Sequence, residues 1–228
     1  MKILLGISGA SGSVYGVRAA AALLSGGAEL HLLVTRMGWE IMAGELPGEP
    51  PPPSHPARKR WIARLLPSSA GTCVLHPEDD FRIPFASGSN PPDAVIIAPC
   101  SMGLLGRIAH GVSTSVLERC TDVALKEKKP LVLVPRETPL SSIHLENMLA
   151  LSRAGAEILP ACPGFYHRPS SVDDLVDFVV ARILSRVGVV AGRYPRWGEG
   201  GAEEANEGEK AATGRTVRTP RRSRHPGR

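Results

Sequence analysis

The sequence predicts an α/β fold of three layers, Rossmann- or flavodoxin-like, in which a mostly parallel sheet carries helices on both faces. Three observations indicate it. Strand-like and helix-like segments alternate along the 228 residues. The strand segments 93–99 and 130–135 are almost continuously apolar, which is typical of parallel strands covered on both faces. The stretch 2–13 (KILLGISGASGS) begins as another apolar strand and ends in small residues just before a helical pattern at Val14.

The other elements follow from the spacing of apolar residues and from the residues that end each run. Further strands are expected at 29–35, 72–75 and 156–160. Helices are expected at 14–24, 36–44, 58–66, from Ser101 or a neighbour to 109, from Ser113 or Thr114 to about 129, at 141–153 and, after a Ser171 cap, at 172–187. The proline-dense segment 47–56 excludes a helix or a central strand and predicts an exposed insertion.

Composition predicts a single globular domain of ordinary polarity, with 43% hydrophobic and 21% charged residues. No apolar run approaches the roughly 20 residues that a membrane helix needs. The four cysteines form no CxxC pair, so neither a zinc site nor a disulfide framework is indicated, and we expect a reduced, cytoplasmic protein.

The net charge of +5 is concentrated at one end of the chain. Seven of the 27 Lys and Arg residues lie in 210–228, which leaves 20 basic against 22 acidic residues in the rest. The sequence therefore predicts a domain at 1–197, a disordered basic tail at 198–228, and no nucleic-acid surface on the body.

Small or polar residues follow four of the predicted strands, where ligands bind in open α/β sheets. These strand ends are Ser8 to Ser13, Thr35-Arg36, Cys100 to Gly103 and Arg136 to Thr138. Because the carboxyl ends of parallel strands share one edge, they describe a single pocket for a phosphate-bearing ligand, to which Arg136 adds a charge-assisted bond. The opening loop, with unpaired donors in its first helical turn, fits phosphate or flavin binding and a plain tight connection equally well.

Several other residues have both a functional and a structural interpretation. Arg119 and Lys126 lie seven residues apart on one helix face, which suits an anion site or a solvated surface. Glu137, beside Arg136, suits a proton carrier or a structural ion pair.

Two segments near the end of the predicted domain add further candidates. Tyr166, His167 and Arg168 could bind an anion from a proline-bounded loop, although a histidine alone is more often a surface residue. Arg182, on an apolar helix, is either a surface arginine or a buried anion ligand, and Trp197 is a packing anchor or a lid.

Taken together, the motifs resemble the flavin prenyltransferases over residues 3–197, apart from the proline-rich segment. The segments that carry the resemblance are GISGASGSVYGVR, ASGS, APCSMGLLGRIAHG, ERCTDVALKEKKPLVLVPRETPLSSIHLENML, PACPGFYHRPSSVDDLVDFVVARIL and PRW. The resemblance implies a flavodoxin-like homo-oligomer, often a dodecamer, that binds FMN between subunits. It also implies metal-independent transfer of a dimethylallyl group from dimethylallyl phosphate to N5 and C6 of reduced FMN, making the cofactor of a partner decarboxylase.

The resemblance also assigns roles to single residues. It implies FMN contacts from Gly9, Ala10, Ser11, Thr35, Ser101, Met102, Gly103, Leu104 and Arg136. It implies dimethylallyl phosphate contacts from Ser87, Arg119, Lys126, Tyr166, Arg182 and Trp197. Glu137 would move protons, with Ser11, Arg119, Lys126 and Tyr166 completing the catalytic set. The family often carries serine at Thr35 and threonine at Leu104, so one hydrogen bond to the flavin is in doubt at Leu104.

The chemistry of these residues agrees with the implied reaction. Cations and a phenol stabilise a departing phosphate without a metal, and an aromatic face such as Trp197 stabilises an allylic cation. Two alternatives remain open. An FMN-dependent decarboxylase of cysteinyl peptides or phosphopantothenoylcysteine would carry a PxMNxxMW segment and a catalytic histidine, and neither appears in a matching place. A non-catalytic flavin-binding protein would not need the cations and Glu137 together.

Overall fold

The computed structural model describes residues 1–66 and 71–189, and it confirms the predicted α/β fold. The strands in this part of the chain are β1 (Lys2–Ile7), β2 (Glu29–Val34), β3 (Thr72–His76), β4 (Ala94–Cys100), β5 (Leu131–Pro135) and β6 (Glu157–Ile158). They form one sheet in the order β3-β2-β1-β4-β5-β6, and every pairing is parallel. This is the Rossmann strand order, so the chain reverses direction across the sheet between β1 and β4, where ligands bind in such folds.

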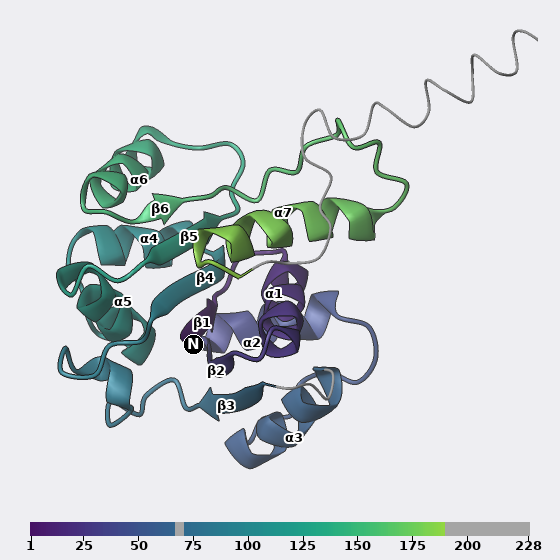
Figure 1. Ribbon diagram of the computed structural model, residues 1–228, viewed down its shortest axis with the longest axis horizontal. Coiled ribbons are helices and arrows are strands. Elements are labelled where there is room, and N and C mark those ends of the chain that lie inside the picture. Colours follow the sequence, from purple (N-terminus) through teal and green to yellow (C-terminus); the bar gives the residue numbers. More distant parts are fainter. Residues whose placement is uncertain (67–70, 190–228) are drawn as a thin grey trace, which may run out of the picture. The chain divides into compact units, whose positions relative to one another are not determined.

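Helices cover both faces of the sheet (Figure 1). One face carries α1 (Ser13–Ser25), α2 (Arg36–Glu45), α3 (His55–Leu65) and α7 (Val172–Arg186). The other face carries the short helix η1 (Pro84–Ala86), α4 (Met102–Ala109), α5 (Val116–Lys126) and α6 (Ser142–Arg153). The structure therefore has the three layers that the sequence predicts.

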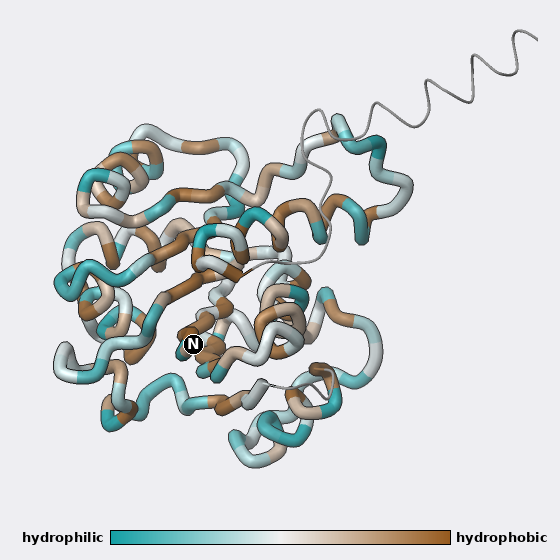
Figure 2. The backbone as a smooth tube through the Cα atoms, in the orientation of Figure 1, coloured by the Kyte–Doolittle hydropathy of each residue, from teal (hydrophilic) through white to brown (hydrophobic). Residues whose placement is uncertain are grey.

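The strands supply both hydrophobic cores because successive side chains point to opposite faces. Ile3 and Leu5 pack into the core beneath α1 and α7, whereas Leu4 packs into the core beneath α4 and α5. All seven residues of β4 are buried. Figure 2 shows the result as hydrophobic strands between helices of mixed character. The nearly continuous apolar runs thus do reflect strands that are covered on both sides.

Serine caps set the starts of several helices. Ser101 caps α4 and Ser171 caps α7, as the sequence predicts. The expected start and end of α5 are wrong by a few residues. Its start is set by a capping box between Ser115 and Glu118, and Lys128, with φ 53°, ends the helix before the predicted residue 129.

The proline-rich segment is exposed or half-buried along its length, but the expectation that it contains no helical residue is wrong. Helix α3 begins inside it, at His55, because Pro56 occupies the first turn, where a helix needs no N–H donor. Trp61 is buried, and its Nε1 donates to the carbonyl oxygen of Glu49 at 3.0 Å. Arg58 Nε donates to the carbonyl oxygen of Pro52 at 2.9 Å. The segment is therefore attached to α3, which also contributes a buried tryptophan to the core.

Candidate active site

Ser8 joins the carboxyl ends of β1 and β4 at the point where the strand order reverses. Its hydroxyl donates to the carbonyl oxygen of Pro99 at 2.8 Å and accepts from the Ser101 N–H at 2.8 Å. Ser8 is 1% exposed, so these bonds are shielded from water. They fix the start of the loop after β1 relative to the start of α4.

Two helices begin at this edge, next to that loop. The hydroxyl of Thr35 accepts from the Gly38 N–H at 3.0 Å and caps α2, and Ser101 does the same for α4. The loop lies tightly against α2, because a Cβ atom added to Gly9 would be 2.5 Å from Met37 Cβ. Each helix N-terminus contributes N–H donors and a partial positive charge to the same edge.

Arg136 connects the end of β5 to the loop after β1. Its Nε donates to the carbonyl oxygen of Ser11 at 3.0 Å, across 125 residues of sequence. The neighbouring Glu137 is exposed, and its carboxylate accepts from the Thr138 N–H at 3.1 Å. Among the ion pairs of the described residues there is none between Arg136 and Glu137, so the structural-pair interpretation of Glu137 is not supported.

The first turn of α1 differs from its expected state. The sequence predicts unpaired donors there, but Glu45, at the end of α2, has taken them. Its carboxylate accepts from the Gly12 N–H at 3.0 Å, from the Ser13 N–H at 2.8 Å and from the Ser13 hydroxyl at 2.8 Å. Burial raises the pKa of Glu45, but hydrogen bonds from Ser11, Ser13 and Gly12 outweigh it and lower the pKa overall.

Three of the predicted substrate residues lie together on the face of the sheet that η1 and α5 cover. Arg119 Nε donates to the carbonyl oxygen of Ala86 at 3.0 Å, which places it against the residue before Ser87. A Cβ atom added to Gly88 would be 2.2 Å from Lys126 Nζ. Arg119 is also bonded to Asp122, and Lys126 to Glu127. Both cations therefore flank the loop that carries Ser87, and we call Ser87, Arg119 and Lys126 the α5 cation group.

The α5 cation group extends away from the edge where Arg136 lies. Helix α5 has 11 residues, about 16 Å, and leads into β5, whose first residue is Leu131. Because α5 runs back toward the amino ends of the strands, Lys126 lies near the edge opposite to Arg136. Within one chain, Lys126 therefore lies apart from Arg136.

Tyr166 lies in the loop between β6 and α7, and Arg182 lies on α7. The ring of Tyr166 contacts that of Phe178 on α7 edge to face, with centroids 5.8 Å apart. Arg182 follows Phe178 by one helical turn and so lies on the same helix face. Both Tyr166 and Arg182 are exposed, which excludes the interpretation of Arg182 as a buried ligand within the monomer. Trp197, like the predicted tail, lies outside the described residues.

Other kinds of site receive no support from residues 1–66 and 71–189. Within these ranges, no three His, Cys, Asp or Glu side chains are grouped to hold a metal ion, and no helix is long and apolar enough to cross a membrane. All four cysteines are free. Cys100, directly before Ser101, is fully buried, and burial raises the pKa of its thiol to about 12, so it is no nucleophile.

The comparisons with known proteins agree on one family. A family model described as Flavoprotein matches residues 1–184. The chain is 48% identical over 202 residues to the flavin prenyltransferase UbiX of Pseudomonas aeruginosa, which covers 87% of this chain and 94% of the relative. The chain belongs to the flavin prenyltransferase family.

Two solved structures of this kind resemble the fold closely. A dodecameric FMN-dependent UbiX-like decarboxylase from Escherichia coli O157:H7 has a TM-score of 0.76 and 39% identity, covering 86% of this chain and 99% of the other. AnUbiX (PadA1), in complex with FMN and dimethylallyl pyrophosphate, has a TM-score of 0.76 and 35% identity, covering 86% and 96%.

The residues at the carboxyl edge fit the flavin cofactor that this prenyltransferase family is named for. Arg136 offers a fixed positive charge, and the N-termini of α2 and α4 offer backbone donors, which together suit a phosphate and polar ring edges. Met102 and Leu104, both buried on α4, pack into the core beneath that helix. Gly103 is exposed between them, so the backbone is open to a ligand there.

Sequence reasoning missed two carboxylates of this prenyltransferase. Glu118, 2% exposed, accepts from Arg107, Thr114 and Ser115 and so ties α4 to α5. The spacing of Ser115 and Glu118 was a readable signal for it. Glu45 has no local signal, because its partners lie more than 30 residues earlier in the chain.

Proposed function

We propose that this chain is a flavin prenyltransferase that transfers a dimethylallyl group from dimethylallyl phosphate to N5 and C6 of reduced FMN. The observation that carries the proposal is the convergence of Arg136, Ser11 and the capped N-termini of α2 and α4 at the β1–β4 crevice. Family membership, and a related structure in complex with FMN and dimethylallyl pyrophosphate, support the same reaction.

In this proposal, the carboxyl edge holds the cofactor. Arg136 and the N-termini of α2 and α4, which Thr35 and Ser101 cap, bind the polar parts of FMN. The remaining contacts are made by Gly9, Ala10, Ser11, Met102, Gly103 and Leu104. Reduced FMN, when bound, supplies the nucleophilic ring atoms that accept the prenyl group. The tight packing of Gly9 on Met37 holds the loop in shape before the cofactor arrives.

The cations serve the leaving phosphate. Arg119 and Lys126 provide positive charge, and Ser87 and Tyr166 provide hydroxyl groups, so negative charge on the departing phosphate is stabilised without a metal ion. Arg182 adds a cation from the face of α7 that Tyr166 contacts through Phe178. Trp197 would complete this set.

Glu137 is proposed as the residue that moves protons. It is exposed at the end of β5, directly after Arg136, which donates a hydrogen bond to Ser11 in the loop after β1. Carboxylates in such positions exchange protons with a bound ligand either directly or through one water or phosphate oxygen. Ring closure at C6 requires the loss of a proton, for which Glu137 is the acceptor at this edge.

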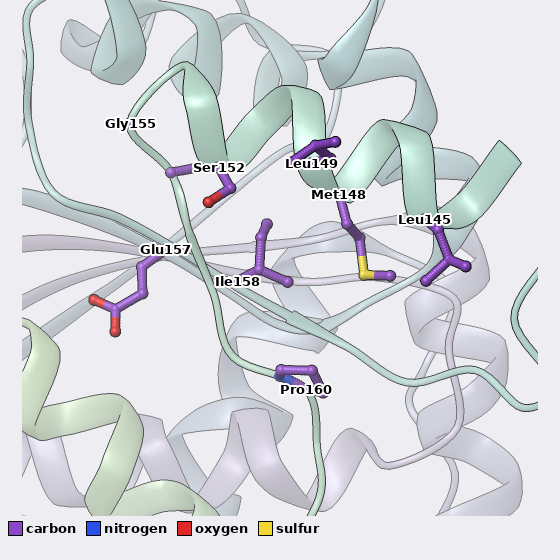
Figure 3. A pocket seen from close by; sticks show the side chains of 9 residues that line it. Leu145, Met148, Leu149, Ser152, Gly155, Glu157, Ile158 and Pro160 are labelled. Atoms are coloured by element: carbon purple, nitrogen blue, oxygen red, sulfur yellow. The ribbon is translucent and has the colours of Figure 1, made fainter. Parts of the chain in front are cut away.

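The proposed site is completed in a homo-oligomer, which we infer to be a dodecamer. Lys126 of the α5 cation group and Arg136 lie near opposite edges of the sheet, so a second copy must bring them together. Helix α6 exposes Ile143, Leu145 and Leu149, which are 65%, 52% and 50% exposed. Leu145 and Leu149 border a hollow of about 580 Å³ between α6 and β6 (Figure 3). An exposed apolar helix face with a hollow beside it suits a subunit interface, and one related structure is dodecameric.

The proposal also covers the setting of the reaction. We infer a cytoplasmic enzyme, in keeping with four free cysteines. Its product would serve a decarboxylase that uses prenylated FMN.

The decisive experiment uses the full chain, reduced FMN and dimethylallyl phosphate under anaerobic conditions. The flavin is extracted and its mass compared with that of FMN. A gain of one C5 prenyl unit supports the proposal. Bound FMN of unchanged mass, with either the monophosphate or the pyrophosphate donor, would overturn it.

A variant tests the role of Glu137 in the same assay. We expect Glu137→Gln to lower the rate of product formation by about 10²–10⁴-fold while FMN affinity stays within about twofold, because a proton carrier acts on the chemical step. Glu146→Gln, an exposed carboxylate on α6, is the matched control and should react at the wild-type rate. A Glu137→Gln enzyme of normal rate would remove this residue from the mechanism.

A further inference from the structure

The two cations of α5 have a carboxylate between them. Arg119, Asp122 and Lys126 occupy positions i, i+3 and i+7 of the helix, so all three lie on one face. Arg119 Nη1 donates to Asp122 Oδ2 at 2.6 Å, and the Asp122 side chain is 41% exposed, so a ligand can approach it. An anion that bridges the two cations therefore lies over a negative charge.

The loop before β4 lies against the same helix face. Arg119 Nε donates to the carbonyl oxygen of Ala86 at 3.0 Å, and a Cβ atom added to Gly88 would be 2.2 Å from Lys126 Nζ. The loop thus runs from the first cation to the second, and Ser87 lies between these two contacts. Asp122 occupies the corresponding middle position on the helix, so it belongs to the region where a phosphate would bind.

The charges of the four side chains in this region cancel. Arg119 and Lys126 supply two positive charges, whereas Asp122 and Glu127, which is bonded to Lys126, supply two negative charges. These carboxylates share the N–H donors that phosphate oxygens would use, and they repel a phosphate. Of the five N–H donors of Arg119, Ala86 and Asp122 take two and fix the direction of the others. The region is therefore built for selective rather than for the tightest possible phosphate binding.

We propose that Asp122, together with Glu127 at the second cation, sets the charge of the leaving group that the site accepts. A phosphate monoester carries about two negative charges at pH 7, and a pyrophosphate ester carries at least one more. Over a cluster of zero net charge the additional charge gains nothing, and the pyrophosphate still pays for its larger desolvation. Asp122 is thus the repulsive element that makes the monophosphate the preferred donor. This inference rests on the proposed function, from which it takes the ligand.

A purely structural role for Asp122 predicts a different result. If Asp122 only held the side chain of Arg119 in place, its loss would weaken both donors to the same degree. The ratio of their kcat/KM values would then stay constant. A residue that selects by charge changes this ratio, whatever happens to the absolute rates.

The experiment measures kcat/KM of the assembled full chain for dimethylallyl phosphate and for dimethylallyl pyrophosphate, with reduced FMN under anaerobic conditions. We expect Asp122→Asn to shift the ratio about tenfold toward the pyrophosphate, which is the effect of one unit charge a few ångströms away in a partly solvated site. Asp122→Glu keeps the charge and should keep the wild-type preference. Glu40→Gln, which removes an exposed carboxylate of α2, is the matched control and should not change the ratio.

A binding measurement makes the test independent of turnover. Calorimetric titration of the FMN-loaded protein with inorganic phosphate and with inorganic pyrophosphate should show a shift of the same size and direction in the ratio of dissociation constants. Circular dichroism checks the fold. If Asp122→Asn is unfolded, Glu127→Gln makes the same comparison at the second cation and should shift both ratios in the same direction.

An unchanged ratio in either measurement, a shift toward the monophosphate, or a wild-type preference for the pyrophosphate would overturn the inference. If the wild-type protein transfers a prenyl group from neither donor, the proposed function fails instead. The two failures are therefore distinguishable.

Discussion

The carboxyl-edge residues and the α5 cation group differ in how completely one chain builds them. At the carboxyl edge, hydrogen bonds across long stretches of sequence join Ser8 to Ser101, Arg136 to Ser11 and Glu45 to Gly12. Among residues 1–66 and 71–189, the polar partners of the α5 cations are Asp122, Glu127 and the carbonyl oxygen of Ala86, all near them, and α5 carries Lys126 to the other edge of the sheet. Under the proposed function, this difference means that one chain preorganises the cofactor site, whereas the substrate site depends on assembly.

The largest expected effect comes from mixing two inactive variants. Arg136→Ala removes a residue of the carboxyl edge, and Lys126→Ala removes one of the α5 cation group. We expect each variant alone to lose at least about 10²-fold in the rate of prenyl transfer. In the first, every site lacks the charge next to FMN, and in the second, every site lacks a charge next to the leaving phosphate. Co-expressed with different tags and purified as mixed oligomers, they should regain activity, since some sites then combine two intact halves.

The controls for this experiment are mixtures made after separate purification, which should stay inactive if subunits do not exchange. Mixed oligomers that remain as inactive as the parents would show that each site uses residues from one chain. The comparison between the two regions would then be wrong.

A smaller and more selective effect is expected at the exposed face of α6. We expect Leu149→Lys to reduce the size of the assembly and to lower prenyl transfer in proportion, because burying a lysine ammonium in an apolar interface is strongly unfavourable. FMN affinity should stay within about threefold if the carboxyl edge is complete in one chain. Native mass spectrometry and flavin titration measure the two properties separately.

Val172→Lys provides the matched control, because Val172 is 75% exposed on a different helix. It should leave both assembly and activity unchanged. A Leu149→Lys protein of unaltered size would place the interface elsewhere, and a loss of FMN binding on dissociation would contradict a cofactor site built by one chain.

The sequence was sufficient for the fold because the signals for the fold are local. Apolar runs mark the buried strands, and Ser101 and Ser171 mark helix starts within a few residues of the side chains that they cap. The seven-residue spacing also placed Arg119 and Lys126 on one face correctly. It could not show which loop they flank, because that follows from how η1 packs on α5.

The parts that sequence reasoning missed depend on contacts between distant segments. Nothing near Glu45 indicates that its carboxylate belongs to α1, since the partner helix is defined by the sheet order. The attachment of the proline-rich segment likewise depends on Trp61, which reaches back 12 residues to Glu49. Patterns in a sequence specify elements, whereas tertiary packing decides which polar groups they satisfy.

The smallest effect is expected at the β2–β3 side of the sheet, where pH should affect the supports of the cofactor edge but not the α5 cations. His31 Nδ1 and His76 Nε2 are 2.8 Å apart, and His31 Nε2 is 3.0 Å from the Glu29 carboxylate. If His31 donates to Glu29, its Nδ1 accepts from His76. Burial is the main cause, and the nearby His31 the second, that lowers the pKa of His76 from 6.5 to about 4. The folded protein therefore keeps His76 neutral near pH 7.

The unfolded chain binds this proton below pH 6.5, whereas the folded protein does so only near pH 4, so acid favours unfolding. Stability should therefore be full above pH 6.5 and fall between pH 6.5 and 4, by about 1 kcal/mol once partial solvent screening is allowed for.

His76→Gln keeps a donor for His31 but does not titrate, so its melting temperature should vary less across this window. His110→Gln, at an exposed histidine, should keep the wild-type slope. An equally steep slope in His76→Gln would assign the acid sensitivity to other groups, such as the carboxylates of Glu45 and Glu118, whose lowered pKa values place their effect at lower pH.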